Sequence, residues 1–386
     1  MQDAHGRAPE GDAVRDSVNV ATVAIALITN YLAGYRIPLY SRLAERHGVE
    51  VLCYGGGERY VPAWFADLDA QLARAPFPAR RLGGTREALR LGERYESVIA
   101  PFAGGRLLPA AYAGARRSGA GFVLWASVWA QPRSAAHLLA LPATRHIYRH
   151  ADAVVAYGEH VRSFVSRIRG HGDDVFVAPQ AVERELFGRL VPAAEVAAFR
   201  ARHALPEGPI VLYVGRLVAE KGVAVLLEAF RGLDAEATLV LIGDGPLAGQ
   251  AQGAPRTRLL APLAREELSP AYAAATITVL ASVPTPRFRE PWGLVVNEAM
   301  HQGRPVIVSD TVGAAAGGLV RDGETGLVVS AGDGAALTGA IARLLADEEL
   351  RRRLGEAGRR AQADYTYEAM AAAFERALTV ARARRG

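Results

Sequence analysis

The sequence predicts an α/β protein built from two parallel-sheet domains that face each other across a cleft. Three observations predict this class. The chain has 386 residues, and a domain usually holds about 100–200 residues, so two domains are expected. Short, almost continuously apolar runs alternate with amphipathic stretches, as in parallel sheets that helices cover on both faces. This alternation breaks once, near the middle of the chain, and then resumes.

The first series of elements predicts a domain at 20–187. Its apolar, β-branched runs predict strands at 20–28, 49–54, 97–100, 122–126, 153–156 and 175–178. Helices are expected between them, among others at 36–47 and 134–150. Residues 1–19 mix charged residues with glycine and proline and lack the apolar core of a signal peptide, so they predict a disordered tail.

The break at 188–208 combines prolines and glycines with one helical stretch and predicts an interdomain linker. A second domain is expected at 209–364. Its predicted strands are 210–214, 238–242, 276–280, 305–309 and 326–329, and its predicted helices include 221–231, 293–302, 335–345 and 348–363. A final helix is expected at 368–384. Ligands of such sheets bind beyond the carboxyl ends of the strands, so the loops after the strands should carry the function.

The composition excludes several classes of protein. Half of the residues are hydrophobic and 22% are charged, which excludes a disordered chain. The single cysteine, Cys53, excludes an intrachain disulfide and a cysteine zinc cluster. The longest apolar run, 20–29, is about half of the ~20 residues that a membrane-spanning helix needs. These features favour a cytoplasmic protein, with peripheral contact at the inner face of the membrane as a further hypothesis.

The basic residues are unevenly chosen. Of the 45 lysines and arginines, Lys221 is the single lysine. Such a bias indicates compositional drift, so the number of arginines carries little functional information. The position of the one remaining lysine is therefore of interest.

Lys221 belongs to a motif that runs from Val214 to Gly222 and reads VGRLVAEKG. Gly215 permits a tight turn after the expected strand. Arg216 and Lys221 then place two cations near a helix N-terminus, whose free N–H groups attract anions. The motif predicts a diphosphate site. The alternative is a solvated arginine beside a surface ion pair, but the only lysine of the chain falls in this loop.

A second motif, EPWGLVVNEAM, spans 290–300 and opens a predicted helix. The amides of Gly293, Leu294 and Val295 would lie unpaired in its first turn, available to phosphate oxygens. Glu290 and Glu298 flank these amides, so that two carboxylates can bind two sets of hydroxyls with a diphosphate between them. The alternative is one acid that caps the helix and one on its surface.

Together these motifs closely resemble the retaining nucleotide-sugar glycosyltransferases of GT-B fold, family four. Three further segments match in the family's order, at 241–247, 303–307 and 322–328. The resemblance covers about 209–360, whereas the first domain matches mainly in architecture and in 177–182. It implies two Rossmann-like domains, the first for the acceptor and the second for the nucleotide-sugar donor, and a C-terminal helix at 365–386 that crosses back to the first domain.

The resemblance also implies a role for each motif residue. Arg216 and Lys221 would bind the donor diphosphate together with the first turn at 293–295. Glu290 would hold the hydroxyls of the transferred sugar, and Glu298 those of the ribose.

Three other positions are implied to surround the donor. Leu260 and Leu263 would flank the base. Gly34, the one glycine in the loop after the first strand, would permit close approach of the donor phosphate.

The implied reaction moves a hexose-type sugar from a nucleoside diphosphate sugar to a hydroxyl with retention, without a metal or another cofactor. The expected acceptor is a glycan, a lipid-linked molecule or a small molecule in cell-surface glycan, glycolipid or natural-product biosynthesis. Two alternatives remain. One is a GT-B nucleotide-sugar epimerase or hydrolase, and the other is a non-catalytic nucleotide-sugar-binding relative.

The first domain departs from the family pattern. Its loop at 126–132 has no histidine, and Trp129 in that loop is interpreted as a core residue rather than a sugar-stacking platform. Residues 18–187 carry 20 arginines against 14 acidic residues. This excess indicates either attraction of an anionic acceptor or membrane, or a solvated arginine-rich face. No recognised nucleic-acid module occurs, so nucleic acid is not an expected partner. The oligomeric state is unknown.

Overall fold

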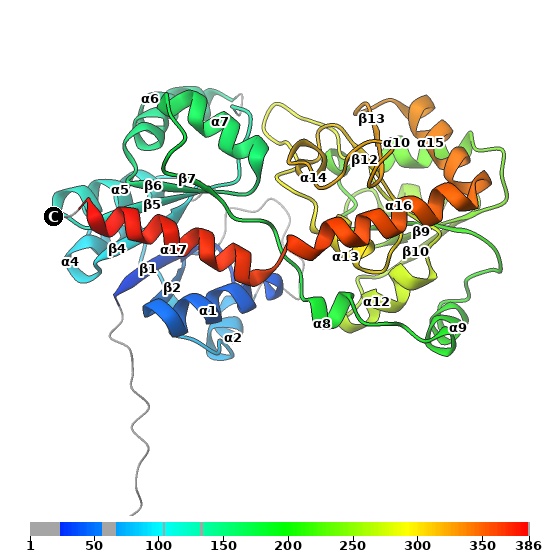
Figure 1. The fold of residues 1–386 in the computed structure, drawn as a ribbon, viewed down its shortest axis with the longest axis horizontal. Coiled ribbons are helices and arrows are strands. Elements are labelled where there is room, and N and C mark those ends of the chain that lie inside the picture. Colours follow the sequence, from blue (N-terminus) through cyan, green and yellow to red (C-terminus); the bar gives the residue numbers. More distant parts are fainter. Residues whose placement is uncertain (1–23, 56–66, 103–104, 132–133, 385–386) are drawn as a thin grey trace, which may run out of the picture.

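The structure is a computed structural model that describes residues 24–55, 67–102, 105–131 and 134–384. It consists of two α/β domains placed side by side (Figure 1). The predicted tail at 1–19 and the start of the first predicted strand lie outside the described residues.

The first domain holds a seven-stranded parallel sheet. Its strands are β1 (Ile25–Thr29), β2 (Val49–Cys53), β3 (Ala79–Arg81), β4 (Ser97–Pro101), β5 (Gly121–Ala126), β6 (Ala153–Ala156) and β7 (Val175–Val177). They are hydrogen-bonded in the order β3-β2-β1-β4-β5-β6-β7. The helices of this part of the chain are η1 (Gly34–Arg36), α1 (Ile37–His47), α2 (Leu68–Ala73), α3 (Thr85–Ala88), α4 (Leu91–Arg94), α5 (Leu107–Arg117), α6 (Ala135–His150) and α7 (Glu159–Arg169).

The second domain holds a six-stranded parallel sheet. Its strands are β8 (Ile210–Val214), β9 (Thr238–Ile242), β10 (Thr257–Leu260), β11 (Ile277–Leu280), β12 (Val306–Ser309) and β13 (Leu327–Val329), in the order β10-β9-β8-β11-β12-β13. The remaining helices are α8 (Arg184–Phe187), α9 (Ala193–Arg202), η3 (Ala219–Lys221), α10 (Val223–Arg231), α11 (Ala248–Gln252), α12 (Arg265–Ala274), α13 (Leu294–His301), α14 (Gly313–Ala316), α15 (Gly334–Ala346), α16 (Glu348–Ala361), η4 (Gln362–Asp364) and α17 (Tyr367–Ala383).

Strand β1 shows why these strands are apolar on both sides. Ile25 and Leu27 pack in one core layer with α1 and α17, whereas Ala26 and Ile28 pack in the opposite layer with α5 and α7. Successive strand residues point to opposite faces, and both faces are covered by helices, so every position is buried. The two parallel sheets expected from the sequence are confirmed.

Two edge strands were missing from the sequence-based prediction. Strands β3 and β10 form one edge of each sheet. β3 is three residues long and contains Arg80 and Arg81, and β10 contains the exposed Arg258. An edge strand buries less of its surface and therefore needs fewer apolar residues, so the apolar-run criterion does not detect it.

The segment expected as a linker, 188–208, packs on the second domain. Helix α9 packs against α12, and Phe199 and Leu205 belong to the core of the second domain. Its prolines and glycines interrupt the strand–helix alternation, which made it look like a connection. The segment is thus a folded extension of the second domain.

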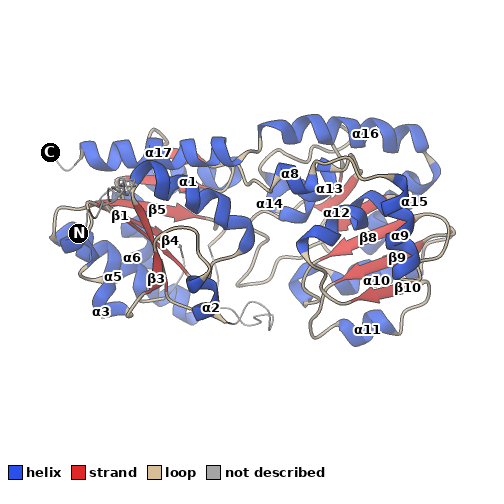
Figure 2. Cartoon of the chain, turned by 90° about the horizontal axis from the view of Figure 1, so that it is seen from below, coloured by secondary structure: helices blue, strands red, loops and turns tan. Residues whose placement is uncertain are grey.

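The end of the chain connects the two domains. Helices α16 and α17 lie end to end along one side of the molecule, α16 on the second domain and α17 on the first (Figures 1 and 2). Met370, Phe374 and Leu378 of α17 are buried in the core layer that also contains α1 and β1. The final helix expected to cross back to the first domain therefore packs there. Within the described residues, every helix is too short or too polar to cross a membrane.

Candidate functional site

A cavity of about 520 Å³ lies where the carboxyl ends of the two sheets face each other. The loops after β1, β5 and β6 line it from the first domain, and the loops after β8 and β11 with the start of α13 line it from the second. Seven of the predicted site residues line this cavity: Gly215, Arg216, Lys221, Glu290, Gly293, Leu294 and Val295. The motifs are brought together because each directly follows a strand of a parallel sheet.

Glu290 is held firmly in the second-domain wall. Its side chain is buried, with 6% of the residue exposed. Lys221 Nζ lies 2.5 Å from Glu290 Oε2, and Ser282 Oγ donates a hydrogen bond of 3.0 Å to the same oxygen. The backbone carbonyl of Glu290 accepts hydrogen bonds from Gly313 N–H and Trp129 Nε1–H. One Glu290 carboxylate oxygen, Oε1, has no protein donor among the described residues and is available to a hydroxyl.

Gly222 allows the turn that carries Lys221 to lie close to Glu290. Gly222 follows η3 with a φ of +71°, and a β-carbon there would lie 1.8 Å from the carbonyl oxygen of Ala281. Only glycine permits this contact. The turn that carries Lys221 is thereby pressed against the loop that carries Ser282, so the close pairing of Lys221 with Glu290 follows from the backbone.

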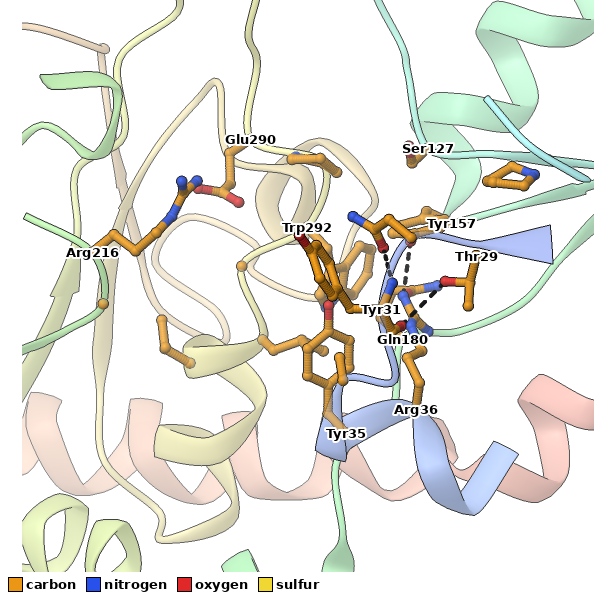
Figure 3. A pocket seen from close by; sticks show the side chains of 18 of the residues that line it. Thr29, Tyr31, Tyr35, Arg36, Ser127, Tyr157, Gln180, Arg216, Glu290 and Trp292 are labelled. Atoms are coloured by element: carbon orange, nitrogen blue, oxygen red, sulfur yellow. Dashed lines mark hydrogen bonds between the residues drawn. The ribbon is translucent and has the colours of Figure 1, made fainter. Parts of the chain in front are cut away.

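The cavity wall carries an excess of positive charge. Its charged residues are Arg36, Arg216, Lys221 and Glu290, three cations against one carboxylate. In the described part of the chain, Arg216 pairs with no carboxylate; its own carbonyl accepts a hydrogen bond from Tyr213 Oη, which positions the loop. Figure 3 shows Arg216 and Glu290 on the same side of the cavity. A polyanion would be attracted to such a wall.

Helix α13 adds backbone donors to this wall. Its N-cap residue Gly293 has a φ of +94°, and a β-carbon there would lie 2.5 Å from Leu280 Cδ2. Close packing against the end of β11 therefore fixes the helix start at the cavity. The first-turn amides, at Leu294 and Val295, have no carbonyl partner inside the helix and attract anions.

Glu298 lies one turn further along α13. Tyr272 Oη donates a hydrogen bond of 2.6 Å to Glu298 Oε2. Burial raises the pKa of Glu298 to about 6, although the hydrogen bond from Tyr272 and the charge of Arg265 lower it. Burial therefore destabilises the ionised form of the Glu298 carboxyl, as expected for a carboxylate that binds a ligand.

Replacing Glu298 by glutamine is expected to stabilise the protein at neutral pH and to weaken nucleotide binding. Because the folded pKa of about 6 exceeds the ordinary value of 4.5, ionisation destabilises the fold as pH rises through this window. Glutamine removes a cost of roughly 2 kcal/mol above pH 6, and this gain should vanish below about pH 4.5. Thermal unfolding of both proteins at pH 7.5 and pH 4.5 measures the difference. A gain of equal size at both pH values would contradict the assignment.

The first domain contacts the site through a histidine that the sequence analysis did not single out. His160, in the first turn of α7, hydrogen-bonds through Nε2 to the carbonyl oxygen of Pro291 at 3.0 Å. Burial lowers the pKa of His160 to about 4, although this hydrogen bond raises it, so the ring is neutral at physiological pH. A carbonyl only accepts, so Nε2 carries the proton. Trp292 lies alongside, with ring centroids 6.0 Å apart.

Trp129 packs against the first-domain core, as predicted, and also contacts the facing domain. It is half-buried, donates through Nε1 to the carbonyl of Glu290 at 3.2 Å, and stacks with Arg289 at 5.1 Å. No sequence pattern indicates this polar partner for the indole N–H. Trp129 lines a second cavity of about 460 Å³ beside the first.

Four predicted residues do not line the main cavity. Glu298 lies behind the first turn of α13. Gly34 opens η1 and faces Arg265, whose Nη1 would be 3.5 Å from a β-carbon at that position. Leu260 ends β10 and Leu263 follows it, both partly buried against the second-domain core. Their roles around a donor stay predictions.

The structure also brings together residues that sequence reasoning missed. Arg36, Tyr157 and Gln180 meet at the first-domain wall of the cavity and are hydrogen-bonded to one another through Arg36 (Figure 3). Arg36 ends η1, whereas Tyr157 and Gln180 lie in the loops after β6 and β7, and no local spacing connects the three. The one sequence feature that could have pointed to this group is Arg36 itself, an arginine followed by the apolar start of a helix.

Comparison with known proteins finds a family match over most of the second domain. Residues 196–361 match the family model of glycosyl transferases group 1. The chain is 32% identical over 226 residues to alpha-D-kanosaminyltransferase of Streptomyces kanamyceticus, covering 55% of this chain and 56% of that protein. It is also 32% identical over 242 residues to D-inositol 3-phosphate glycosyltransferase of Xylanimonas cellulosilytica, covering 58% and 56%. The chain thus spans about half the length of the relatives it matches.

Solved structures show the same two-domain arrangement over nearly the whole chain. Anabaena HepE, solved in complex with UDP, superposes with a TM-score of 0.75 at 16% identity, covering 92% of this chain and 99% of that one. Sucrose-phosphate synthase from Thermosynechococcus elongatus gives a TM-score of 0.69 at 24% identity, covering 91% and 97%. At these identities the likeness concerns the fold. The chain therefore has the GT-B fold, and residues 196–361 are similar to glycosyl transferases group 1.

Proposed function

We propose that this protein transfers a hexose-type sugar, with retention at the anomeric carbon, from a nucleoside diphosphate sugar to an acceptor hydroxyl. One observation carries the proposal. Arg216, Lys221 and the start of α13 gather around the buried carboxylate of Glu290 at the end of a parallel sheet. Such a group can hold a diphosphate and a sugar hydroxyl side by side.

The names of similar proteins support this donor class. The relatives include an alpha-D-kanosaminyltransferase and D-inositol 3-phosphate glycosyltransferases, and HepE was also solved in complex with UDP-glucose. We therefore take a uridine diphosphate sugar as the first donor to test. The acceptor is a glycan, a lipid-linked molecule or a small molecule, and contact with an anionic membrane stays a prediction.

In the proposed mechanism, Lys221 exchanges its partner. In this structure it pairs with Glu290, whereas the arriving diphosphate offers two negative charges. Lys221 and Arg216 then neutralise the phosphates, and Glu290 accepts a hydrogen bond from the sugar. The binding of the donor thus releases the carboxylate for the sugar.

The chemical step follows from the same groups. As the bond between the anomeric carbon and the phosphate oxygen breaks, negative charge grows on the leaving diphosphate, where Arg216, Lys221 and the α13 amides stabilise it. The acceptor hydroxyl forms the new bond from the same face. Its proton passes to the leaving phosphate, so no side-chain base is needed. Closure of the cleft would exclude water.

The proposal predicts stabilisation by nucleotide sugars. We expect UDP or UDP-glucose at 100 times its dissociation constant to add about 2.7 kcal/mol to the free energy of unfolding. A thermal-shift screen of UDP, GDP and ADP sugars, with uridine as the control lacking phosphates, measures this effect. Absence of a shift with every nucleotide would contradict the donor assignment.

A turnover assay separates transfer from the alternatives. With the best donor of the screen, product should form only in the presence of an acceptor, and the anomeric configuration of the product should match that of the donor. Rapid turnover of the donor alone would instead indicate an epimerase or a hydrolase. Binding without any turnover across a wide acceptor panel would indicate a non-catalytic relative.

A further inference from the structure

The first-domain wall of the cavity contains a buried cation. Arg36 precedes α1 and lines the cavity, and only 6% of the residue is exposed. Figure 3 shows its guanidinium beside Tyr157 and Gln180, on the opposite side of the cavity from Arg216 and Glu290. It is therefore not one of the groups that surround the proposed diphosphate.

The partners of Arg36 are all uncharged. Nη2 donates to Tyr157 Oη at 2.9 Å and to Gln180 Oε1 at 2.8 Å, and Nη1 contacts Met370 Sδ at 3.7 Å. The guanidinium carbon lies 4.7 Å from the centroid of the Trp125 ring. No carboxylate of the described residues forms an ion pair with Arg36.

The charge of Arg36 is maintained despite this environment. Burial lowers its pKa, the neighbouring tyrosines, foremost Tyr157 and Tyr35, raise it, and the net pKa is raised. An arginine side chain stays protonated in proteins. A buried charge without an opposite charge costs several kcal/mol, so such residues are normally paired.

Another buried arginine in the same domain shows how a buried cation is usually compensated. Arg169, with 1% of its side chain exposed, forms an ion pair of 2.5 Å with Asp174 and donates to the carbonyl oxygens of Tyr148 and Ala151. Arg36 is equally remote from bulk water but opens on a cavity instead of a carboxylate. Its uncharged partners fix the orientation of the guanidinium and leave N–H groups for a further acceptor, because a guanidinium has five.

We propose that the acceptor of this enzyme is a hydroxylated molecule with an anionic group, phosphate or carboxylate, and that Arg36 binds this group. This inference rests on the proposed transfer reaction and names its acceptor class. The anion would complete the charge balance of Arg36. Tyr157, which is half-buried at the cavity wall, would pack against the acceptor ring, and the free hydroxyl would face the sugar held by Glu290. Arg36 is thus a specificity residue.

The test uses matched charged and neutral probes on the protein saturated with UDP, so that Arg216 and Lys221 are already occupied. The probes are glucose 6-phosphate and glucuronate, each compared with glucose, and binding is measured by calorimetry. A charge-assisted hydrogen bond contributes about 1.5–3 kcal/mol, so we expect at least about tenfold tighter binding of the charged probes. Equal affinities for charged and neutral probes overturn the proposal.

Two variants test whether Arg36 causes the preference for charged over neutral probes. Arg36→Met should abolish it while leaving UDP affinity unchanged. Arg46→Met is the matched control, because Arg46 lies on α1, which begins directly after Arg36 along the chain, but pairs with Glu368 and Glu375 outside the cavity. Arg46→Met should keep the full preference. Loss of affinity for glucose and glucose 6-phosphate in equal proportion in Arg36→Met would show a merely structural role.

A third variant covers the case in which Arg36→Met does not fold. Arg36→Lys keeps the charge but loses the planar fork, so an intermediate preference for charged probes is expected. An unchanged preference in Arg36→Lys at unchanged stability, together with binding that persists in high salt, overturns the role of the guanidinium. Failure of the wild type to bind UDP contradicts the proposed donor instead, and the charged probes can then be titrated without UDP, with Lys221→Ala as the reference.

Discussion

Replacing Glu290 by glutamine is expected to lower the rate of sugar transfer by about 10²–10³-fold, the usual cost of losing one group that stabilises a transition state. Glutamine keeps the size of the side chain and can still accept the hydrogen bond from Ser282. It lacks the negative charge that strengthens a hydrogen bond from a sugar hydroxyl as the anomeric carbon becomes positive. The loss should therefore appear in kcat rather than in the binding of UDP.

The ion pair with Lys221 gives this prediction a second, opposite part. In the proposed mechanism, Lys221 of the wild type leaves Glu290, with which it is paired, in order to bind the diphosphate. In Glu290→Gln it is already free, so UDP should bind at least as tightly as to the wild type. Calorimetry with UDP and steady-state transfer rates measure the two parts separately. Full transfer activity in this variant would contradict the proposed role of Glu290 in binding the sugar hydroxyl.

Glu228→Gln is the matched control for the change of charge. Glu228 lies on α10 of the same domain, is exposed, and does not line the cavity. Its substitution should change neither the transfer rate nor the binding of UDP. An effect of similar size in both variants would point to the net charge of the domain rather than to a local contact.

The second-domain side of the site could be predicted from the sequence because its determinants are local. Gly215, Arg216 and Lys221 lie within one loop, and Glu290 lies just before the helix whose first turn completes the wall. Each loop follows a strand, so the parallel topology brings the loops to one edge without further information. The pairing of Lys221 with Glu290 was not foreseen, because both were assigned to the ligand.

The first-domain side could not be predicted in the same way. Arg36 lies more than a hundred positions before Tyr157 and Gln180, and their contact depends on the packing of η1 against the loops after β6 and β7. His160 faces the other domain, and its partner is a backbone carbonyl that no sequence pattern marks. Such contacts arise from the relative placement of the two domains.

Replacing Lys221 by alanine is expected to weaken the binding of UDP at least about tenfold and to lower kcat/KM by about 10²–10³-fold. The cation contributes to binding because it meets the diphosphate, and to the rate because the negative charge of the leaving group grows in the transition state. Arg231→Ala, at the exposed far end of α10, is the matched control and should leave both quantities unchanged. UDP affinity equal to that of the wild type would contradict the role of Lys221.

Stability tests the same residue independently of any ligand. Without Lys221 the buried carboxylate of Glu290 keeps, among the residues that the structure describes, only the hydrogen bond from Ser282, and breaking a buried ion pair costs about 3–5 kcal/mol. The double variant Lys221→Ala/Glu290→Gln removes the orphaned charge, so it should recover much of this loss while transfer stays absent. Denaturant unfolding of the four proteins gives the coupling between the two side chains. If the losses in the free energy of unfolding are additive, the two side chains are not coupled. If the double variant regains stability but not transfer activity, the ion pair stabilises the fold, and the two charges act separately in the transfer.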